Sequence, residues 1–318
     1  GNKMKKELTY LETLKMIGEI KRKFEHELES RLSIMKVPCP LFVKSSSGLQ
    51  DDLSGTEEAV SFISDDTKFE IVHSLAKWKR EALYKYSFMP YTGLYTDMKA
   101  IRKDETIDAV HSLYVEQWDW EKVILKSDRT ISYLKETVRS IYKAFRSTLV
   151  YMKKKYPFLT LDLPKTITFI TTQELETMYP DKTPKEREKL ITEKYKAVFI
   201  IGIGDKLLSG IPHDLRSPDY DDWSLDGDIL IYDKVIDDVV EISSMGIRVD
   251  ESSLLEQLKK TKKEVTVYHK KILDKTLPYT IGGGIGVSRV LMLILGKKDI
   301  REVQASSWSI SLKEIKEL

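Results

Sequence analysis

The order of helical and strand-like stretches along the chain limits the possible folds more than any single motif does. In residues 6–35 apolar side chains recur every three or four positions, which predicts an amphipathic helix. Several short β-rich runs follow, with helical stretches inserted at irregular intervals. A doubly wound parallel sheet would need strands and helices that alternate regularly. We therefore expect an α+β fold, with a mainly antiparallel sheet flanked by helices, in one domain that covers residues 1–318.

The individual elements follow from periodicity and from helix-start signals. Helical spacing returns in residues 131–153 and 253–273. Thr183, Pro184 and Glu186 form the start of another helix, because threonine can cap it, proline fits its first turn and glutamate reaches back to the cap. Strands are expected at 37–43, where two prolines favour an edge, at 69–75, 111–121, 166–171 and 197–203, and in a hairpin formed by 228–232 and 239–249.

Composition excludes several classes of protein. The 318 residues include 52 basic and 50 acidic side chains, a balance that gives no reason to expect binding to a nucleic-acid backbone. A single cysteine, Cys39, rules out an internal disulfide and a cysteine-based metal cluster. No apolar stretch approaches the ~20 residues of a membrane span, and the first ten residues lack the apolar core of a signal peptide. We expect a cytoplasmic protein without a membrane partner.

The stretch "TIGGGIGVSRVLMLIL" (280–295) carries four glycines in five positions before an arginine and an apolar run. It lacks the G-x-G-x-x-G spacing of a dinucleotide fingerprint and the Gly-Lys-Ser/Thr of a P-loop. A glycine-rich bend that packs a helix against a sheet remains one interpretation. In the other, the glycines let the backbone approach a nucleotide, and Arg289, one turn into the helix, reaches a phosphate or stacks on the base.

Three stretches in the same order resemble the motifs of class II aminoacyl-tRNA synthetases. Residues 6–43 resemble motif 1, a long helix that leads to a strand, with Pro38 between them. Residues 93–121 resemble motif 2, two strands joined by a loop that carries Arg102, Asp104 and Glu105. The glycine-rich stretch resembles motif 3.

Longer runs narrow the resemblance to one family. Over essentially the whole chain the sequence resembles the ammonia-dependent asparagine synthetases, or aspartate–ammonia ligases, in the runs "QDDLSG", "FEIVHSLAKWKR", "GLYTDMKAIR", "HSLYVEQWDWE", "PDYDDWS", "ISSMGIRVD" and "TIGGGIG". The resemblance implies a class II synthetase-like catalytic fold and a homodimer formed partly through motif 1. It also implies a two-step reaction. Aspartate attacks the α-phosphate of ATP to give β-aspartyl-adenylate and pyrophosphate, and ammonia then displaces AMP to give asparagine. Cys39 lies between two prolines with no sign of a glutaminase, so free ammonia is the expected nitrogen source.

The resemblance assigns residues to the nucleotide. Arg102 would hold the α-phosphate, whose charge grows in the transition state, and Arg289 would contact the base and the γ-phosphate. Asp228 and Glu241 would hold Mg²⁺, which prefers oxygen ligands; without the resemblance both would be interpreted as solvated carboxylates. The further candidates for ATP binding are Ser112, Ser244 and Gly284.

Other residues are assigned to aspartate and ammonia. Arg248 would clamp a substrate carboxylate, with Lys79 as a second cation. Gln117 would line the amino-acid pocket, and Asp51 would meet the substrate ammonium or the incoming ammonia, where a carboxylate could act as a general base; the neighbouring Asp52 could take its place. The further candidates for substrate binding are Ser74, Asp119, Asp221, Ser243 and Gly246.

Other conspicuous residues and other functions have simpler interpretations. We expect His73 and His111 to be partly buried and hydrogen-bonded rather than catalytic, and Trp78, Trp118 and Trp120 to form core or pocket wall. An aspartyl- or asparaginyl-tRNA synthetase would need an anticodon-binding domain, for which 318 residues leave no room. The alternatives left open are a paralogue that ligates aspartate to another acceptor and a non-catalytic regulator that binds aspartate or AMP. Retention of the arginines and of the metal pair speaks against the regulator.

Overall fold

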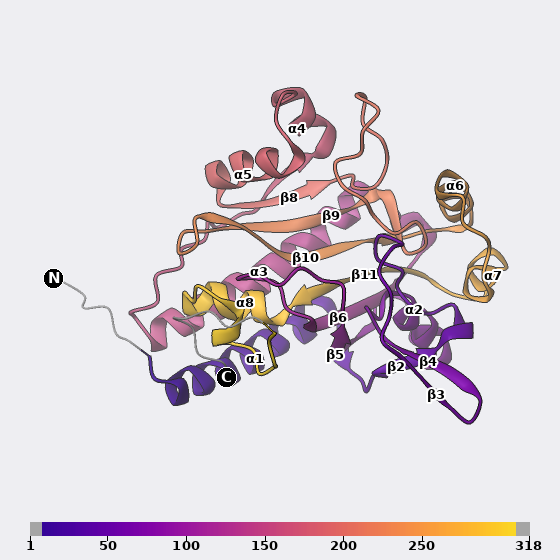
Figure 1. The fold of residues 1–318 in the computed structure, drawn as a ribbon. Helices are drawn as coiled ribbons and strands as arrows, with labels where there is room; N and C mark the ends of the chain where they lie inside the picture. The colour runs from indigo at the N-terminus through magenta and orange to yellow at the C-terminus, as the bar shows by residue number, and fades with distance from the viewer. Residues whose placement is uncertain (1–7, 310–318) are drawn as a thin grey trace.

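A computed structural model describes residues 8–309, and within them the chain forms one large sheet and one small sheet (Figure 1). The large sheet has eight strands in the order β1-β5-β6-β11-β10-β9-β8-β7. Their bounds are β1 Ile34–Lys36, β5 Gly93–Ile101, β6 Tyr114–Ile124, β7 Thr168–Thr171, β8 Ala197–Ile201, β9 Asp221–Asp233, β10 Asp238–Arg248 and β11 Tyr279–Gly286. The small sheet, in the order β2-β4-β3, comprises β2 Phe42–Lys44, β3 Ser61–Ser64 and β4 Thr67–Ile71.

The pairing confirms the expected antiparallel sheet. Only the two outermost pairs, β1 with β5 and β7 with β8, run parallel. The central strands β5, β6, β11, β10, β9 and β8 are antiparallel neighbours throughout. Strands β9 and β10 form the hairpin expected from the sequence, and β10 carries two register shifts, between Glu241 and Ser243 and between Gly246 and Arg248.

One face of the large sheet is covered by α1 (Tyr10–Leu32), α3 (Ile131–Lys155) and α8 (Val287–Leu295). From α1 a stripe at four-residue spacing is buried, and α3 and α8 add apolar side chains to the same core. Figure 1 shows α1 and α3 passing along this side of the strands. The core contributed by α1 consists of Met16, Ile20, Phe24, Leu28 and Leu32, each at most 2% exposed.

The other face of the sheet is covered only at its two ends. Helices α4 (Thr172–Met178) and α5 (Pro184–Tyr195) pack on β7, β8 and β9. Helices α2 (Ala76–Lys85), α6 (Glu251–Thr261) and α7 (Val267–Leu273) lie with the small sheet at the opposite end, as Figure 1 shows. The predicted start of α5 is confirmed, because Thr183 and Glu186 exchange hydrogen bonds of 3.2 and 3.0 Å.

Some sequence expectations were wrong in detail. The helix expected at 253–273 is two helices, since Lys262 adopts a left-handed conformation that ends α6 and Thr266 caps α7. The strands expected at 37–43 and 69–75 are shorter, because only Phe42–Lys44 and Thr67–Ile71 find partners in the small sheet. Leu11 and Leu14 of the expected apolar stripe are 77% and 50% exposed, and Met16 takes their place in the core.

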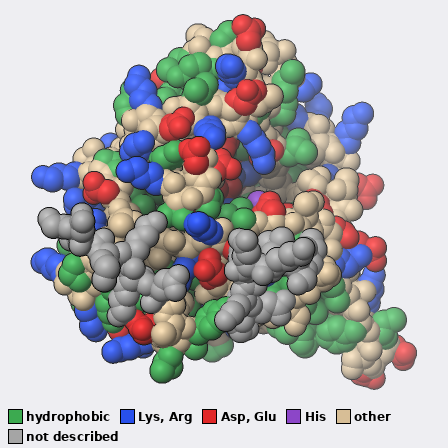
Figure 2. Space-filling view, turned by 60° about the vertical axis from the view of Figure 1, so that its left-hand side comes forward, with side chains coloured by type: hydrophobic (Ala, Val, Ile, Leu, Met, Phe, Trp, Pro, Cys, Tyr) green, Lys and Arg blue, Asp and Glu red, His purple; other side chains and the backbone are tan. Residues whose placement is uncertain are grey.

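The surface agrees with the balanced composition. On the face drawn in Figure 2, basic and acidic side chains are interspersed. Within residues 8–309 no helix is both long enough and apolar enough to cross a membrane.

Candidate active site

A cavity of about 480 Å³ lies on the sheet face that the helices cover only at its ends. Alternation along the strands separates the two faces. In β6, Gln117 and Asp119 line the cavity, whereas Trp118 and Trp120 are buried in the core on the other side. Residues of the loop between β5 and β6, of the segment before β9, and Asp51, Leu53 and Ser54 complete the wall. The structure therefore brings together residues from segments that are distant in the sequence.

The two arginines assigned to phosphate both line the cavity. Arg102, at the end of β5, donates from Nε and Nη2 to the carbonyl of His73, at 3.1 and 2.9 Å. These bonds orient the guanidinium, and Nη1 has no bond to any residue between 8 and 309. Arg289, in the first turn of α8, donates from Nη1 to the carbonyl of Glu241 at 2.8 Å. Both side chains are half-buried and line the cavity, so each can offer N–H groups to an anion.

The carboxylates assigned to magnesium line the cavity beside Arg289, which donates to the backbone of Glu241, and we call this group the phosphate-binding end. Burial and the charge on Glu241 raise the pKa of Asp228 to about 7, although the Arg216 guanidinium lowers it. Glu241 accepts a hydrogen bond of 2.5 Å from Ser244, which fixes one of its oxygens. The pKa of Asp228 indicates that the two carboxylates repel each other, an arrangement that a cation between them would relieve.

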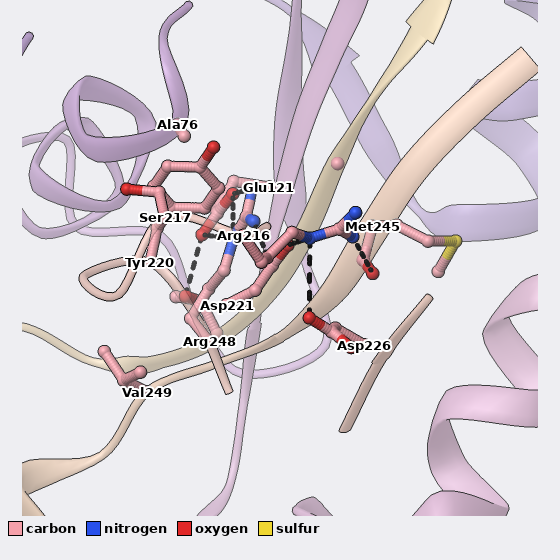
Figure 3. Close-up of polar contacts among 12 residues, drawn as sticks. Ala76, Glu121, Arg216, Ser217, Tyr220, Asp221, Asp226, Met245, Arg248 and Val249 are labelled. Carbon is pink, nitrogen blue, oxygen red and sulfur yellow. Dashed lines mark hydrogen bonds and ion pairs between the residues drawn. The ribbon is translucent and has the colours of Figure 1, made fainter. Parts of the chain in front are cut away.

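The other end of the cavity is formed around Arg248, at the end of β10. Its Nε and Nη2 donate to Glu121, at 3.1 and 3.0 Å, and its Nη1 donates to Asp221 at 2.5 Å (Figure 3). Burial alone would lower the pKa of Arg248, but Glu121 and Asp221 raise it above its ordinary value. These contacts use three of the five N–H groups, and the remaining two, one on each terminal nitrogen, suit a bidentate carboxylate.

The position of Asp51 resolves the choice between neighbouring aspartates. Asp51 is 3% exposed and lines the cavity, where it accepts hydrogen bonds from Ser74 at 2.7 Å and Tyr220 at 3.2 Å. The side chain of Asp52 is 53% exposed and lies 3.9 Å from Lys77 and Lys263. Asp51 is thus the carboxylate that a ligand in the cavity can reach.

Lys79 does not line the cavity. Its ammonium is fully buried, forms an ion pair with Asp119, and donates to the carbonyl of Trp120 at 2.7 Å. Glu121 lies 3.4 Å away. The expectation that Lys79 presents a cation to the cavity is therefore wrong for this conformation, because partners within the protein enclose its charge. Asp119 itself lines the cavity and also accepts from the backbone of Leu75.

The remaining predicted residues divide into two groups. Those that line the cavity are Ser74, Ser112, Gln117, Asp221, Ser243, Ser244 and Gly284. Gly284 lies under Gln117, because a Cβ atom on it would come within 2.3 Å of the Gln117 amide oxygen. Gly246 is absent from the wall; there a Cβ atom would meet Asp221 and Asp226 at 2.8 Å, so this glycine makes room for the aspartates.

The histidines and tryptophans mostly follow expectation. Trp118 and Trp120 belong to the core, and Trp78, a residue of α2, packs against smaller apolar clusters. His73 is more buried than expected, at 2% exposed, with Nδ1 2.9 Å from the carbonyl of Asp51. His111 lies at the cavity wall 2.7 Å from Asp108, a carboxylate that sequence reasoning had not paired with it.

Sequence reasoning missed Arg216, Tyr220 and Glu121. Arg216 and Tyr220 line the cavity, and the ring of Tyr220 lies 5.5 Å from the guanidinium of Arg248. Glu121 is fully buried behind Arg248 (Figure 3). All three lie in or beside the runs "PDYDDWS" and "EQWDWE", and alternation from Gln117 and Asp119 could have placed Glu121 on the same face.

Comparison with known proteins identifies the family. The sequence model of the family described as aspartate-ammonia ligase matches residues 11–317. The chain belongs to the aspartate–ammonia ligase family. It is 55% identical over 308 residues to an aspartate–ammonia ligase of Clostridium perfringens, a match that covers 95% of this chain and 91% of that one. It is 54% identical over 315 residues to the corresponding ligase of Fusobacterium nucleatum, with 97% and 95% covered.

Solved structures confirm the class II synthetase-like fold of this aspartate–ammonia ligase family member. Asparaginyl-tRNA synthetase from Pyrococcus horikoshii, in complex with asparaginyl-adenylate, matches with a TM-score of 0.69 at 14% identity. That of Entamoeba histolytica, also with asparaginyl-adenylate, matches with a TM-score of 0.64 at 14% identity. These matches cover 92% and 93% of this chain, and the chain spans about two thirds of the length of those synthetases (67% and 66%).

Proposed function

We propose that this protein is an aspartate–ammonia ligase that makes asparagine from aspartate, ATP and ammonia through a β-aspartyl-adenylate. The observation that carries the proposal is a single cavity whose wall carries Arg248, suited to a carboxylate, together with Arg102 and Arg289, suited to phosphate. Family membership over nearly the whole chain supports it. Residues 1–318 act in this proposal as a single catalytic domain, in the cytoplasm.

The first step joins the two ligands. A β-carboxylate oxygen of aspartate attacks the α-phosphorus of ATP, and the bond to the pyrophosphate leaving group breaks. Arg248 holds the α-carboxylate through its two remaining N–H groups, which orients the β-carboxylate toward the nucleotide. Arg102, anchored to the carbonyl of His73, holds the α-phosphate and stabilises the charge that develops there. Arg289, with the residues Ser112, Ser244 and Gly284, holds the rest of the nucleotide.

The second step takes place at the acyl carbon of the adenylate. Ammonia attacks this carbon, the bond to the phosphate oxygen breaks, and AMP leaves while the nitrogen loses a proton. Asp51 is the carboxylate placed to accept that proton or to hold an ammonium ion, because it is buried at the wall and hydrogen-bonded by Ser74 and Tyr220. Gln117 offers an amide beside the same site.

The residues at the phosphate end also fit a magnesium ion. Among residues 8–309 no group of three or more His, Cys, Asp or Glu side chains is arranged as a complete metal site. Mg²⁺ bound with a nucleotide needs only one or two carboxylates, and the repulsion between Asp228 and Glu241 favours a cation there. When bound, Mg²⁺ would neutralise charge on the phosphates and orient them.

The experiment is product analysis with aspartate, ATP, ammonium and Mg²⁺. We expect equal amounts of asparagine, AMP and pyrophosphate. Formation of ADP instead of AMP would contradict adenylation, and a requirement for tRNA or a protein acceptor would favour a different ligase.

Arg102→Ala tests the phosphate assignment. Since Arg102 would contact the reacting phosphorus, we expect a loss of about 10²–10³ in the rate of aspartate-dependent ATP–pyrophosphate exchange, or roughly 3–4 kcal/mol. Thermal unfolding near the wild-type midpoint would show that the fold survives. Exchange within a factor of two of wild type would refute the assignment.

A homodimer completes the proposal. The resemblance to class II synthetases implies that motif 1, which is α1 and β1 here, forms part of the interface, with Pro38 near it. Strand β1 lies at the outer edge of the large sheet, which supports this arrangement because an edge strand presents unpaired backbone groups to a partner.

A further inference from the structure

Arg216 lies between the two ends of the cavity and has a partner at each. It precedes β9, and its guanidinium reaches between β9 and β10 (Figure 3). Nε donates to Asp221 at 3.0 Å and Nη1 donates to Asp228 at 2.7 Å. Asp221 is also a partner of Arg248 at the carboxylate-binding end, and Asp228 lies at the phosphate-binding end.

The backbone fixes this guanidinium. Nη2 donates to the carbonyls of Gly227 at 3.1 Å and Met245 at 3.3 Å, one on β9 and one on β10. With the bonds to Asp221 and Asp228, the contacts use both N–H groups of Nη2, that of Nε and one of the two on Nη1. The side chain is only 8% exposed. Arg216 therefore cannot move with one aspartate without lengthening its hydrogen bonds to the other aspartate and to the backbone of both strands.

Asp221 is shared by two guanidiniums. Its Oδ1 accepts from Arg248 and its Oδ2 accepts from Arg216, so Arg248, Asp221, Arg216 and Asp228 form a continuous series of alternating charges, called here the Arg216 bridge. A third carboxylate, Asp226, lies 3.4 Å from Nε of Arg216 and also accepts from the backbone of Ile203. It anchors the bridge to the sheet on the side away from the cavity.

Stability alone does not explain such an arrangement. A buried ion pair is often no more stabilising than apolar residues of similar volume, because its charges lose their hydration. Arg187, another buried arginine, illustrates a simpler anchor: it donates to the carbonyls of Tyr179 and Pro180 and does not line the 480 Å³ cavity. Arg216 differs from it in having two carboxylate partners that both face the ligand site.

We propose that Arg216 is a positioning residue that couples the aspartate-binding and nucleotide-binding ends of the cavity, acting through Asp221 on Arg248 and through Asp228 on the magnesium-bound nucleotide. The inference rests on the proposed function for the identity of the two ligands. An aspartate carboxylate on Arg248 competes with Asp221 for that guanidinium. Asp221 then interacts more strongly with Arg216. The ion pair between Arg216 and Asp228 weakens as a result, and the Asp228 carboxylate can interact more strongly with the cation. Each ligand should consequently bind more tightly when the other is present.

The test is calorimetric titration, which requires no turnover. Aspartate is titrated into the protein with and without Mg²⁺ and α,β-methylene-ATP, whose α–β linkage cannot be cleaved, and the analogue is then titrated with and without aspartate. In wild type we expect each ligand to lower the dissociation constant of the other by about 5-fold or more. The factor should be the same in both directions. In Arg216→Met the factor should fall to about 1. Arg216→Lys keeps the charge but cannot reach both aspartates at once, so it should also lose most of the coupling.

The control is Arg187→Met, which removes a buried arginine outside the cavity. It is expected to lower the unfolding temperature and to leave the coupling factor within a factor of two of wild type. If Arg216→Met fails to fold, as judged by circular dichroism, Arg216→Lys decides. Wild-type coupling in the Arg216 variants, or a wild type in which the two ligands bind independently, would overturn the inference. A wild type that binds neither aspartate nor the nucleotide analogue would instead refute the proposed function.

Discussion

At the scale of single residues, burial distinguishes two neighbouring aspartates. Asp51 faces the cavity and is held by Ser74 and Tyr220, whereas Asp52 is largely exposed near Lys77 and Lys263. The turn that follows fixes Asp51 further, because the backbone N–H of Leu53 donates to its Oδ1 at 2.8 Å. Under the proposed function only Asp51 would meet the substrate ammonium or the incoming ammonia, so the two positions provide a matched pair of variants.

We expect Asp51→Asn to slow asparagine formation by about 10²-fold or more, the lower end of the range typical of general-base catalysis, and to slow ATP–pyrophosphate exchange less. Part of the deficit should disappear between pH 7 and pH 9, because more of the ammonium is then already deprotonated. Asp52→Asn should change either rate by less than a factor of two. The measurement is both rates for both variants over this pH range. Equal losses of exchange and amidation in Asp51→Asn would make Asp51 a substrate-binding residue instead.

The pKa of Asp228, raised to about 7 by burial and by Glu241, predicts a dependence of stability on pH. An unfolded aspartate ionises near pH 4, so between about pH 4 and pH 7 the folded state binds a proton that the unfolded state does not. The free energy of unfolding therefore falls over this interval as the pH rises. Asp228→Asn removes the titrating group, and we expect this variant to lose less stability than wild type between pH 5 and pH 8.

Urea unfolding at both pH values measures this difference. Asp219→Asn is a useful comparison, because Lys77 and His269 lower the pKa of Asp219 despite its burial, and its titration therefore lies below pH 4. That variant should be less stable than wild type by a similar amount at pH 5 and pH 8. The same change in wild type and in Asp228→Asn would mean that Asp228 does not titrate in this range.

The sequence allowed a residue to be assigned when its own run of sequence was enough to place it. It did not when the environment of the residue combines several segments of the chain. Arg102, Arg289 and Asp51 lie in motif-like runs that predicted them for the site, and all three line the cavity, although the choice between Asp51 and Asp52 needed the structure. Arg216 could not be assigned, because its environment combines carboxylates of β9 with a carbonyl of β10. Lys79 was assigned to the cavity for its charge, and only the structure reveals that Asp119 and Glu121 enclose it.

At the scale of elements, the glycines of β11 have two different purposes. A Cβ atom on Gly283 would meet the backbone of β10, at 2.7 Å from the carbonyl of Ser244 and 3.0 Å from Cα of Met245. A Cβ atom on Gly284 would meet the end of the Gln117 side chain, at 2.3 Å. Backbone cannot move aside within a paired strand, whereas a side chain facing a cavity can. The packing interpretation of this glycine run is therefore supported at Gly283, whereas at Gly284, which lines the cavity, the ligand interpretation stays a prediction.

Gly283→Ala is expected to destabilise the protein by about 1–3 kcal/mol, the usual range for added atoms in a packed interior. Gly284→Ala should cost less stability, because Gln117 can turn away, but it should raise the KM for aspartate or ATP several-fold. Thermal unfolding and steady-state kinetics of the two variants check this. The reverse pattern, with Gly284→Ala the less stable variant, would contradict the two roles.

Periodicity predicted the long elements better than the short ones. Helix α3 was predicted well because apolar side chains recur along its whole length. It begins at the expected residue 131, after the capping residue Thr130. Helix α2 was not predicted at all: lysine and arginine occupy positions that the fold buries, such as Lys77, Lys79 and Arg80. The break between α6 and α7 depends on the left-handed conformation of Lys262, which no residue type in that stretch demands.

At the scale of the whole molecule, an apolar groove lies beside the free edge of the large sheet. It has a volume of about 720 Å³ and is lined by residues of α1, β1 and the segment that follows α2. Met35 and Met89 in its wall are 57% and 69% exposed. Exposed apolar surface beside an unpaired strand edge is typical of an interface. Motif 1 of the class II fold lies here, so we expect the two copies of the homodimer to meet at this groove.

Light scattering at micromolar concentration should therefore give about 74 kDa, twice the 36.8 kDa of one chain. Met35→Lys would place a charge in the interface without disturbing the fold of the monomer, since the side chain is more than half exposed there. Burying an unpaired ammonium costs several kcal/mol, so the dissociation constant should rise at least about tenfold and monomer should appear. Leu208→Lys, at a residue 89% exposed between β8 and β9, should leave the dimer intact. A dimer that tolerates Met35→Lys, or a wild type near 37 kDa, would mean that this edge of the sheet is not where two copies associate.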